Sequence, residues 1–288
     1  MGSLKTFALA GALALGASAA AAADLAYAPP PPPHEPLGLK GTISSGFYLR
    51  GDIGVGETKV KKYYQQDVAN AGGRFFGETD NLSVFVGAGA GYRLNNWLRF
   101  DGTLEYRGAG QIGVSDRVDF AANGGIARLS NTYKGNLSSI VALFNGYVDL
   151  GTWNCLTPYI GAGIGYASNR ITGLTDQGAL TGSLNSATLG TADSGTKSGV
   201  AWALMAGLGY EVNKNLTLEI GYRYLNLGEA QSGRIQNAFL PESYSPLKAK
   251  EIDSHDIKIG MRWNFGEPEC CGPVERPIYA PAPTVRKY

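Results

Sequence analysis

The sequence is poor in charged residues. Lysine, arginine, aspartate and glutamate together make up 17% of the 288 residues, and the formal net charge at pH 7 is +1. The surface of a soluble domain carries about 25–35% charged residues, and nucleic-acid-binding domains concentrate positive charge. The composition therefore argues against an ordinary soluble protein and against a nucleic-acid partner.

Histidine is nearly absent, with only His34 and His255 in the chain. A metal site would need more nitrogen or sulfur ligands close together, so we expect no metal. The glycine clusters Gly87–Gly91 and Gly161–Gly163 lie inside alternating stretches. A nucleotide-binding loop needs a strand, the glycines and then a helix, so we expect no nucleotide and no other cofactor.

A histidine-based catalytic group is also missing. Ser254, His255 and Asp256 are consecutive, near the start of the last alternating stretch. Adjacent residues on a strand point to opposite faces, so these three side chains cannot form a triad alone. We therefore predict no catalytic residues and expect that the protein is not an enzyme.

The longest apolar run at the N-terminus, Phe7–Leu15, is too short for a transmembrane helix, which needs about 20 apolar residues. Lys5 precedes the run and small residues follow it, as in a secretory signal peptide. We predict a signal peptide over residues 1–22, cleaved between Ala22 and Ala23. An uncleaved anchor is the alternative interpretation.

The dominant pattern is a series of stretches in which apolar and polar residues alternate, separated by gaps that are strictly long, short, long, short. Such a series predicts an all-β fold: an eight-stranded antiparallel up-and-down transmembrane β-barrel with short periplasmic turns and long extracellular loops. The stretches are Gly46–Gly56, Leu82–Arg93, Trp97–Gly108, Leu137–Asp149, Thr157–Ser168, Ser198–Glu211, Leu216–Leu227 and His255–Phe265.

The polar face of these stretches carries cations and anions in nearly equal number, and arginine outnumbers lysine. A confined interior favours arginine paired with carboxylates, and an eight-stranded barrel is only wide enough to be filled by side chains. We therefore predict a charge network in the lumen and no wide pore. Its members are Arg50, Asp52, Arg93, Arg99, Asp101, Glu105, Arg107, Asp149, Glu211, Glu219, Arg223, Lys258 and Arg262.

The apolar face ends in aromatic residues at both rims, which resembles the two girdles of a lipid-facing surface. Together with the signal peptide, these girdles argue against a soluble barrel that keeps its apolar face inside. At the rim with short turns they are Phe47, Tyr92, Tyr210, Trp263 and Phe265, and toward the long gaps they are Tyr106, Tyr166, Trp202 and Tyr224.

Four runs in this order resemble the small OmpA/OmpX-like β-barrels of Gram-negative outer membranes, in the surface-antigen branch labelled "porin family". They are VGAGAGYRLNNWLRFDGTLEYR, TPYIGAGIGYASN, NLTLEIGYRYLNLG and HDIKIGMRWNF. The resemblance implies a structural or adhesive protein of the cell outer membrane, in contact with outer-membrane lipid and lipopolysaccharide and inserted by the outer-membrane insertion machinery. The word "porin" does not imply an activity here.

The resemblance also bears on the two ends of the chain. Some relatives with a mature Ala-Asp start are joined to peptidoglycan, so Ala23 and Asp24 are a candidate attachment site, followed by a Pro-rich periplasmic leader over residues 23–45. The alternative is that this leader is disordered and is not attached to peptidoglycan. Relatives usually end on an aromatic residue, whereas here the barrel, over residues 46–265, is followed by a periplasmic tail over residues 266–288.

The three cysteines are an odd number for an oxidising compartment. Cys155 lies in a short turn, and Cys270 and Cys271 follow the last stretch, which ends on the same rim. We predict a disulfide between Cys155 and either Cys270 or Cys271. A bond between Cys270 and Cys271, an intermolecular bond and three free thiols are the alternatives.

The long gaps are predicted to be extracellular loops, of which the third is expected to be mobile. Lys59, Lys61 and Lys62 in the first are either a contact for lipopolysaccharide phosphates or host glycans, or a plain solvated segment. We expect a barrel that supports envelope integrity and displays these loops for interaction or adhesion. The alternatives are a small-solute channel and a lipid A-modifying enzyme. The oligomeric state does not follow from the sequence. The loops are residues 57–81, 109–136, 169–197 and 228–254.

Overall fold

The computed structural model describes residues 46–77, 81–239 and 241–265. The predicted signal peptide, the Pro-rich leader and the C-terminal tail lie outside these residues. No helix in the described ranges is long and apolar enough to cross a membrane.

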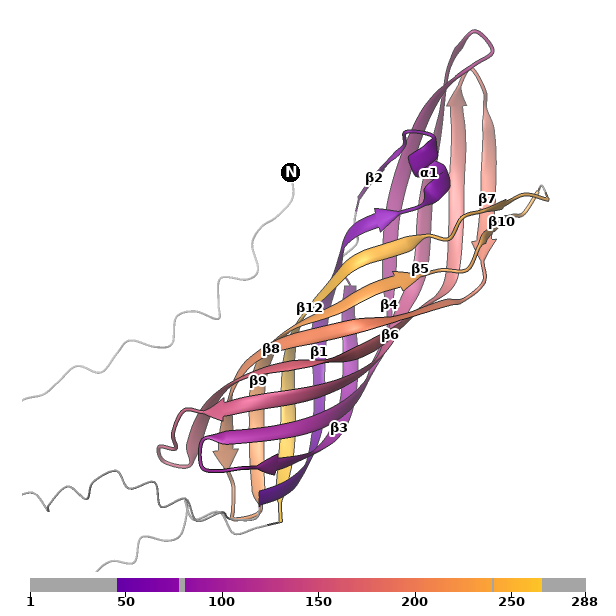
Figure 1. Ribbon diagram of the computed structural model, residues 1–288. Coiled ribbons are helices and arrows are strands. Elements are labelled where there is room, and N and C mark those ends of the chain that lie inside the picture. The colour runs from indigo at the N-terminus through magenta and orange to yellow at the C-terminus, as the bar shows by residue number, and fades with distance from the viewer. Residues whose placement is uncertain (1–45, 78–80, 240, 266–288) are drawn as a thin grey trace, which may run out of the picture. The chain divides into compact units, whose positions relative to one another are not determined.

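Antiparallel strands close into a ring, as Figure 1 shows. Each strand pairs with its neighbours in the ring, and the last, β12, pairs with the first, β1, so the ring has no free edge. The eight-stranded barrel predicted from the alternation is confirmed. The ring strands are β1 (Gly46–Tyr64), β3 (Asn81–Arg93), β4 (Leu98–Ala122), β5 (Gly125–Asp149), β6 (Leu156–Gly182), β8 (Gly195–Glu211), β9 (Leu216–Gln231) and β12 (Lys248–Asn264).

At one end of the ring, which we call the turn end, short turns join β3 to β4, β5 to β6 and β8 to β9. Two of them use the same device. The Asn95 side-chain oxygen accepts from the backbone N–H groups of Trp97 and Leu98 at 3.0 and 2.8 Å. Asn213 does the same for Asn215 and Leu216, both at 2.9 Å. These side chains replace backbone partners that a tight turn lacks, and they fix its conformation.

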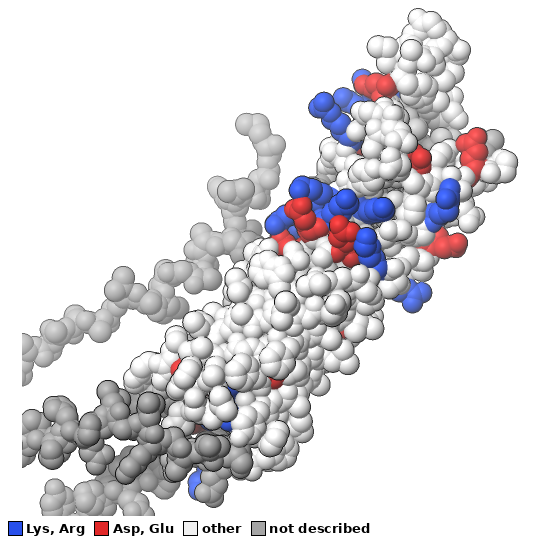
Figure 2. Space-filling model, in the orientation of Figure 1, with Lys and Arg blue, Asp and Glu red and all other residues white. Residues whose placement is uncertain are grey.

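Alternation along each strand separates two faces. On β1, Leu49 is 51% exposed whereas its neighbour Arg50 is 5% exposed. The outward residues of the ring are apolar, and many of the aromatic girdle residues, such as Trp263 and Tyr166, are half exposed or more. Figure 2 shows an almost uniformly uncharged surface over the ring and a band of charged side chains where that surface ends. An apolar belt of this kind faces lipid.

The long gaps differ from the prediction, because most of their residues continue the strands. β6 has 27 residues and β4 and β5 have 25 each, whereas a strand needs only about 9–11 to cross a membrane. The segment expected to be a mobile loop, residues 169–197, forms the end of β6, all of β7 and the start of β8. The predicted long connections are therefore largely paired strands, and not unpaired chain.

The strand continuations form a sheet at the end opposite the turns, which we call the distal extension. β7 pairs with β6, β10 with β7, β11 with β10, and β2 with β4. A two-residue turn at Asn123 and Gly124, both with positive φ, closes the β4–β5 hairpin. The added elements are α1 (Gln66–Asn70), β2 (Arg74–Phe76), β7 (Ser186–Ala192), β10 (Ile235–Asn237) and β11 (Ser243–Tyr244).

Candidate functional site

The interior of the ring contains two groups of ion pairs. In the group nearer the turn end, Arg50 lies 2.8 Å from Asp52, 2.8 Å from Asp101 and 3.2 Å from Glu219. These side chains come from β1, β4 and β9, so a single guanidinium connects three parts of the ring. The Tyr147 hydroxyl on β5 accepts a further bond from Arg50 at 2.9 Å.

Glu219 is the common acceptor of this first group. Besides Arg50, it lies 3.3 Å from Arg99 and 2.9 Å from Arg262. The Arg99 guanidinium lies over the rings of Tyr147 and Tyr159, with 4.2 and 4.8 Å to the two ring centroids. Aromatic faces of this kind stabilise a cation that lacks a full set of hydrogen-bond partners.

The second group lies further from the turn end. Arg107 donates two bonds to the Asp256 carboxylate at 2.9 and 2.7 Å, and Arg223 lies 2.7 Å from both Asp256 and Glu105. Both guanidinium groups also lie near the ring of Phe85, at 4.8 and 4.9 Å from its centroid. Arg107 also lies 3.1 Å from Glu105, so the two arginines and two carboxylates form a square of ion pairs. All four side chains are buried.

Most of the residues predicted for the lumen are brought together by these pairs. Lys258 joins the first group through Asp52 at 3.5 Å, and Asp149 joins it through Arg99 at 3.0 Å. Arg93 makes no ion pair with another member in the part of the chain that the structure describes. Glu211 is buried at the end of β8, where its backbone N–H donates to the Cys155 carbonyl at 2.9 Å.

The sequence analysis missed an apolar layer inside the ring. On β5 the inward residues Val141 and Leu143 are buried, so the outward apolar residues Ile140 and Phe144 alternate with a second apolar set. The run Ile140–Phe144, which is apolar on both faces of the strand, was the indication of this layer in the sequence. The layer lies beside and beyond the ion pairs; its members include Ile112, Leu137, Val141, Leu143, Ile171, Met205, Leu225, Leu227 and Ile252.

The residues considered for catalysis do not meet. His255 lies on the outward face, where its Nδ1 is 2.6 Å from the Tyr222 hydroxyl. Ser254 and Asp256 point inward and are bonded to one another at 2.6 Å. Within the described ranges no cluster of His, Cys, Asp and Glu has the arrangement of a metal site.

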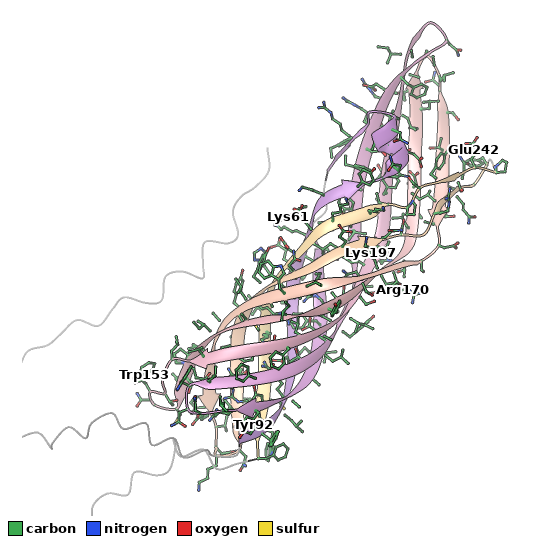
Figure 3. All side chains as sticks on the ribbon, viewed as in Figure 1. Lys61, Tyr92, Trp153, Arg170, Lys197 and Glu242 are labelled. Atoms are coloured by element: carbon green, nitrogen blue, oxygen red, sulfur yellow. The ribbon has the colours of Figure 1, made fainter. Side chains whose placement is uncertain are left out.

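The lysines near the end of the apolar belt are paired with carboxylates. Lys61 pairs with Asp253, Lys62 pairs with Glu251 at 2.5 Å, and Lys59 lies 3.3 Å from Glu57. Figure 3 shows Lys61 and Lys197 projecting at the level where the strands leave the ring.

Cys155 lies in the turn between β5 and β6 and is disulfide-bonded. The other two cysteines lie outside the described residues, so the pairing of Cys155 with Cys270 or Cys271 stays a prediction.

A family model described as the outer membrane protein beta-barrel domain matches residues 7–265. An uncharacterised protein of Brucella suis biovar 1 is 31% identical over 248 residues, which cover 77% of this chain and 85% of the relative. The chain therefore belongs to the outer membrane protein beta-barrel family, and it is an outer-membrane protein.

Two further similarities concern an adhesin and a solved barrel. A putative adhesin of Rickettsia bellii is 25% identical over 223 residues, covering 77% of this chain and 89% of the relative. Among solved structures, the outer membrane protein OprG of Pseudomonas aeruginosa has a TM-score of 0.40 and 12% identity, covering 78% of this chain and 98% of that chain.

The buried square gives the first testable prediction. Arg223→Met keeps the length of the side chain but leaves Glu105 and Asp256 with Arg107 as their remaining arginine. Removing one partner of a buried ion pair costs about 3–5 kcal/mol, so we expect the free energy of unfolding in urea to fall by about that amount. Arg170→Met is the matched control: this arginine is exposed on β6, and its loss is expected to cost less than about 0.5 kcal/mol. Equal effects of the two substitutions would show that the square does not stabilise the barrel.

Proposed function

We propose that this protein is a structural outer-membrane barrel that supports envelope integrity and displays the distal extension as a surface for interaction or adhesion. The display role has one observation behind it: β4, β5 and β6 continue well past the apolar belt as a hydrogen-bonded sheet. Loops that only return the chain to the membrane do not need such length. A sheet held by ladder bonds presents its side chains in fixed positions, which a binding surface requires.

In the proposed orientation the distal extension is extracellular and both termini are periplasmic. The short turns at the opposite end are consistent with this, because outer-membrane barrels have short periplasmic turns and longer extracellular segments. In this orientation the charged band at the end of the apolar belt lies at the level of the lipopolysaccharide headgroups in the outer leaflet.

A channel is the weaker candidate. The ion-paired side chains and the apolar layer are buried in the interior of the described ring, which favours a barrel closed to solutes. A lipid A-modifying enzyme is weaker still, because His255 lies apart from Ser254 and Asp256. The similarity to a putative adhesin favours the display function.

Adherence of bacteria that carry the protein tests this proposal. Gln111 and Asn136 are cross-strand partners, so the hairpin between them can be replaced by an Asn-Gly turn without a change of register. Laboratory bacteria displaying the full chain are expected to adhere to cultured mammalian cells several-fold better than bacteria with an empty vector. The shortened variant is expected to adhere at the vector level.

The control for this experiment is the Arg170→Met variant, which alters an exposed residue of β6 and keeps the hairpin. All three proteins must be present in the outer membrane in equal amount and must show the heat-dependent gel mobility of a folded barrel. Undiminished adherence of the shortened variant would contradict display through this hairpin.

Attachment to peptidoglycan is a second, separate proposal, based on the predicted mature Ala23-Asp24 start and the proline-rich segment after it. A fraction of the molecules is expected to carry a muropeptide on the amino group of Ala23. Digestion of washed sacculi with lysozyme, followed by mass spectrometry of the N-terminal peptide, measures this fraction. Only unmodified Ala23 on exhaustively washed sacculi would rule out the attachment.

A further inference from the structure

A cavity of about 270 Å³ lies in the distal extension, separate from the ion-paired interior. Its floor is the sheet formed by β4, β5, β6 and β7. Its cover comes from the segment around α1 and from β10 and β11. In Figure 1, α1 lies in front of the continuation of β4 and β5.

The pairing register of the strands places four of the residues that line the cavity in one row across the sheet. Tyr133 on β5 is opposite Asp176 on β6, Asp176 is opposite Gly190 on β7, and Gly190 is opposite Asn237 on β10. Directly opposite residues share a face of the sheet, so all four face the cavity. A Cβ at Gly190 would come within 3.3 Å of the Asp176 Cβ and 2.9 Å of Ile235, so this glycine leaves the space beside Asp176 open.

Specific bonds hold the cover in place. The Asp67 carboxylate accepts from the backbone N–H and the hydroxyl of Ser245 at 2.6 and 2.8 Å. Gln65 donates to the Ser245 carbonyl at 3.0 Å, and Val68 is buried. The cavity is therefore formed without a ligand, as most small-molecule sites are.

Two aspartates near the floor differ in their partners. Asp116 is satisfied: it accepts from the Tyr133 hydroxyl at 2.8 Å and from the Asn131 side-chain amide at 3.1 Å. Asp176 Oδ1 is shielded from solvent and has no hydrogen-bond partner within the described part of the chain. The Asp176 side chain lines the cavity, and its carboxylate is a charge that a cationic ligand can neutralise there.

The lining has acidic residues and no basic one. Asp67 and Asp176 lie in it, and neither lysine nor arginine is among the described residues that line the cavity. The rest is mainly apolar or aromatic, with Val118, Leu129 and Tyr244 among its members. Charge complementarity thus favours a cation, and the apolar walls favour a hydrocarbon or aromatic body.

We propose that this cavity binds a small organic amine, whose ammonium group donates to Asp176 and whose apolar body lies between α1 and the sheet. Aromatic rings at Tyr133 and Tyr244 add faces that attract a cation. The site goes beyond the display function and does not depend on it, because a ligand can bind whether or not the extension mediates adhesion.

The ionisation of Asp176 supplies a further test. Burial, and then the nearby Asp116, raise the pKa of Asp176 to about 7. The other titratable groups around the cavity are Tyr133 from β5, Tyr244 from β11 and Asp67 from α1; burial raises the pKa of Asp116 and of both tyrosines. The Asp176 carboxylate forms as the pH rises through 7. An amine is therefore expected to bind about tenfold more tightly at pH 8 than at pH 6.

Calorimetric titration of the full chain in detergent micelles tests the proposal with three probes of similar shape. They are 2-phenylethylamine, 2-phenylethanol and phenylacetate, which are cationic, neutral and anionic. The amine is expected to bind at least tenfold more tightly than the alcohol, and phenylacetate is expected not to bind. Equal binding of amine and alcohol, or no binding of the amine, would overturn the proposal.

Asp176→Asn keeps the shape of the side chain and removes its charge. This variant is expected to lose at least tenfold in amine affinity and to lose the pH dependence, while its affinity for the alcohol stays the same. Asp119→Asn is the matched control, because Asp119 is a carboxylate of the same extension that pairs with Arg128 at 2.7 Å and does not line the cavity.

A second variant covers the case in which Asp176→Asn disturbs the sheet. Ala71→Trp fills the cavity from its cover and leaves Asp176 in place. It is expected to abolish binding of both the amine and the alcohol. Amine binding that survives both substitutions would place the amine elsewhere on the protein.

Discussion

The narrow interior of an eight-stranded ring is the constraint on which the rest of the structure depends. Such a ring has no room for bulk water, so a charged side chain that is buried inside it is stabilised by partners among the other inward side chains. The ring meets this requirement with shared partners: Glu219 lies within 3.3 Å of three arginines, and Asp256 within 2.7 Å of two. Beyond the ion pairs, buried apolar side chains occupy the interior.

The same constraint separates the barrel from the surface that it carries. The strands of this filled ring continue past the membrane as a paired sheet, with register shifts between Arg107 and Gly110 and between Lys134 and Asn136. The distal extension follows from this, since β4, β5 and β6 keep their pairing well beyond the apolar belt. A cavity with a cover of its own lies in this extension.

The ring was predictable because alternation has a direct physical cause. Leu49 and Arg50 differ in hydropathy because one faces lipid and the other a closed interior, and this difference is visible in the sequence. The set of lumen charges followed in the same way. The pairing of these charges was not predictable. Arg50 donates to Glu219, 169 positions away, because of the stagger between strands around the ring, and alternation does not specify that stagger.

The distal extension was missed for a different reason. Its segments are rich in Gly, Ser, Thr and Asn, and their faces differ less in hydropathy because both are polar in places. The Asn123-Gly124 pair was a hairpin indication that was available in the sequence. The cover of the cavity had no such indication, because the bonds of Gln65 and Asp67 to Ser245 join segments about 180 residues apart.

The central claim is that paired charges and apolar side chains close the barrel, and electrical recording of the purified full chain in planar bilayers tests it most directly. The account predicts no stable open state above the baseline at moderate voltage, under conditions in which an open porin conducts. A large and stable conductance in every preparation would contradict it, because ions would then cross an interior that the ion pairs and the apolar layer are held to fill.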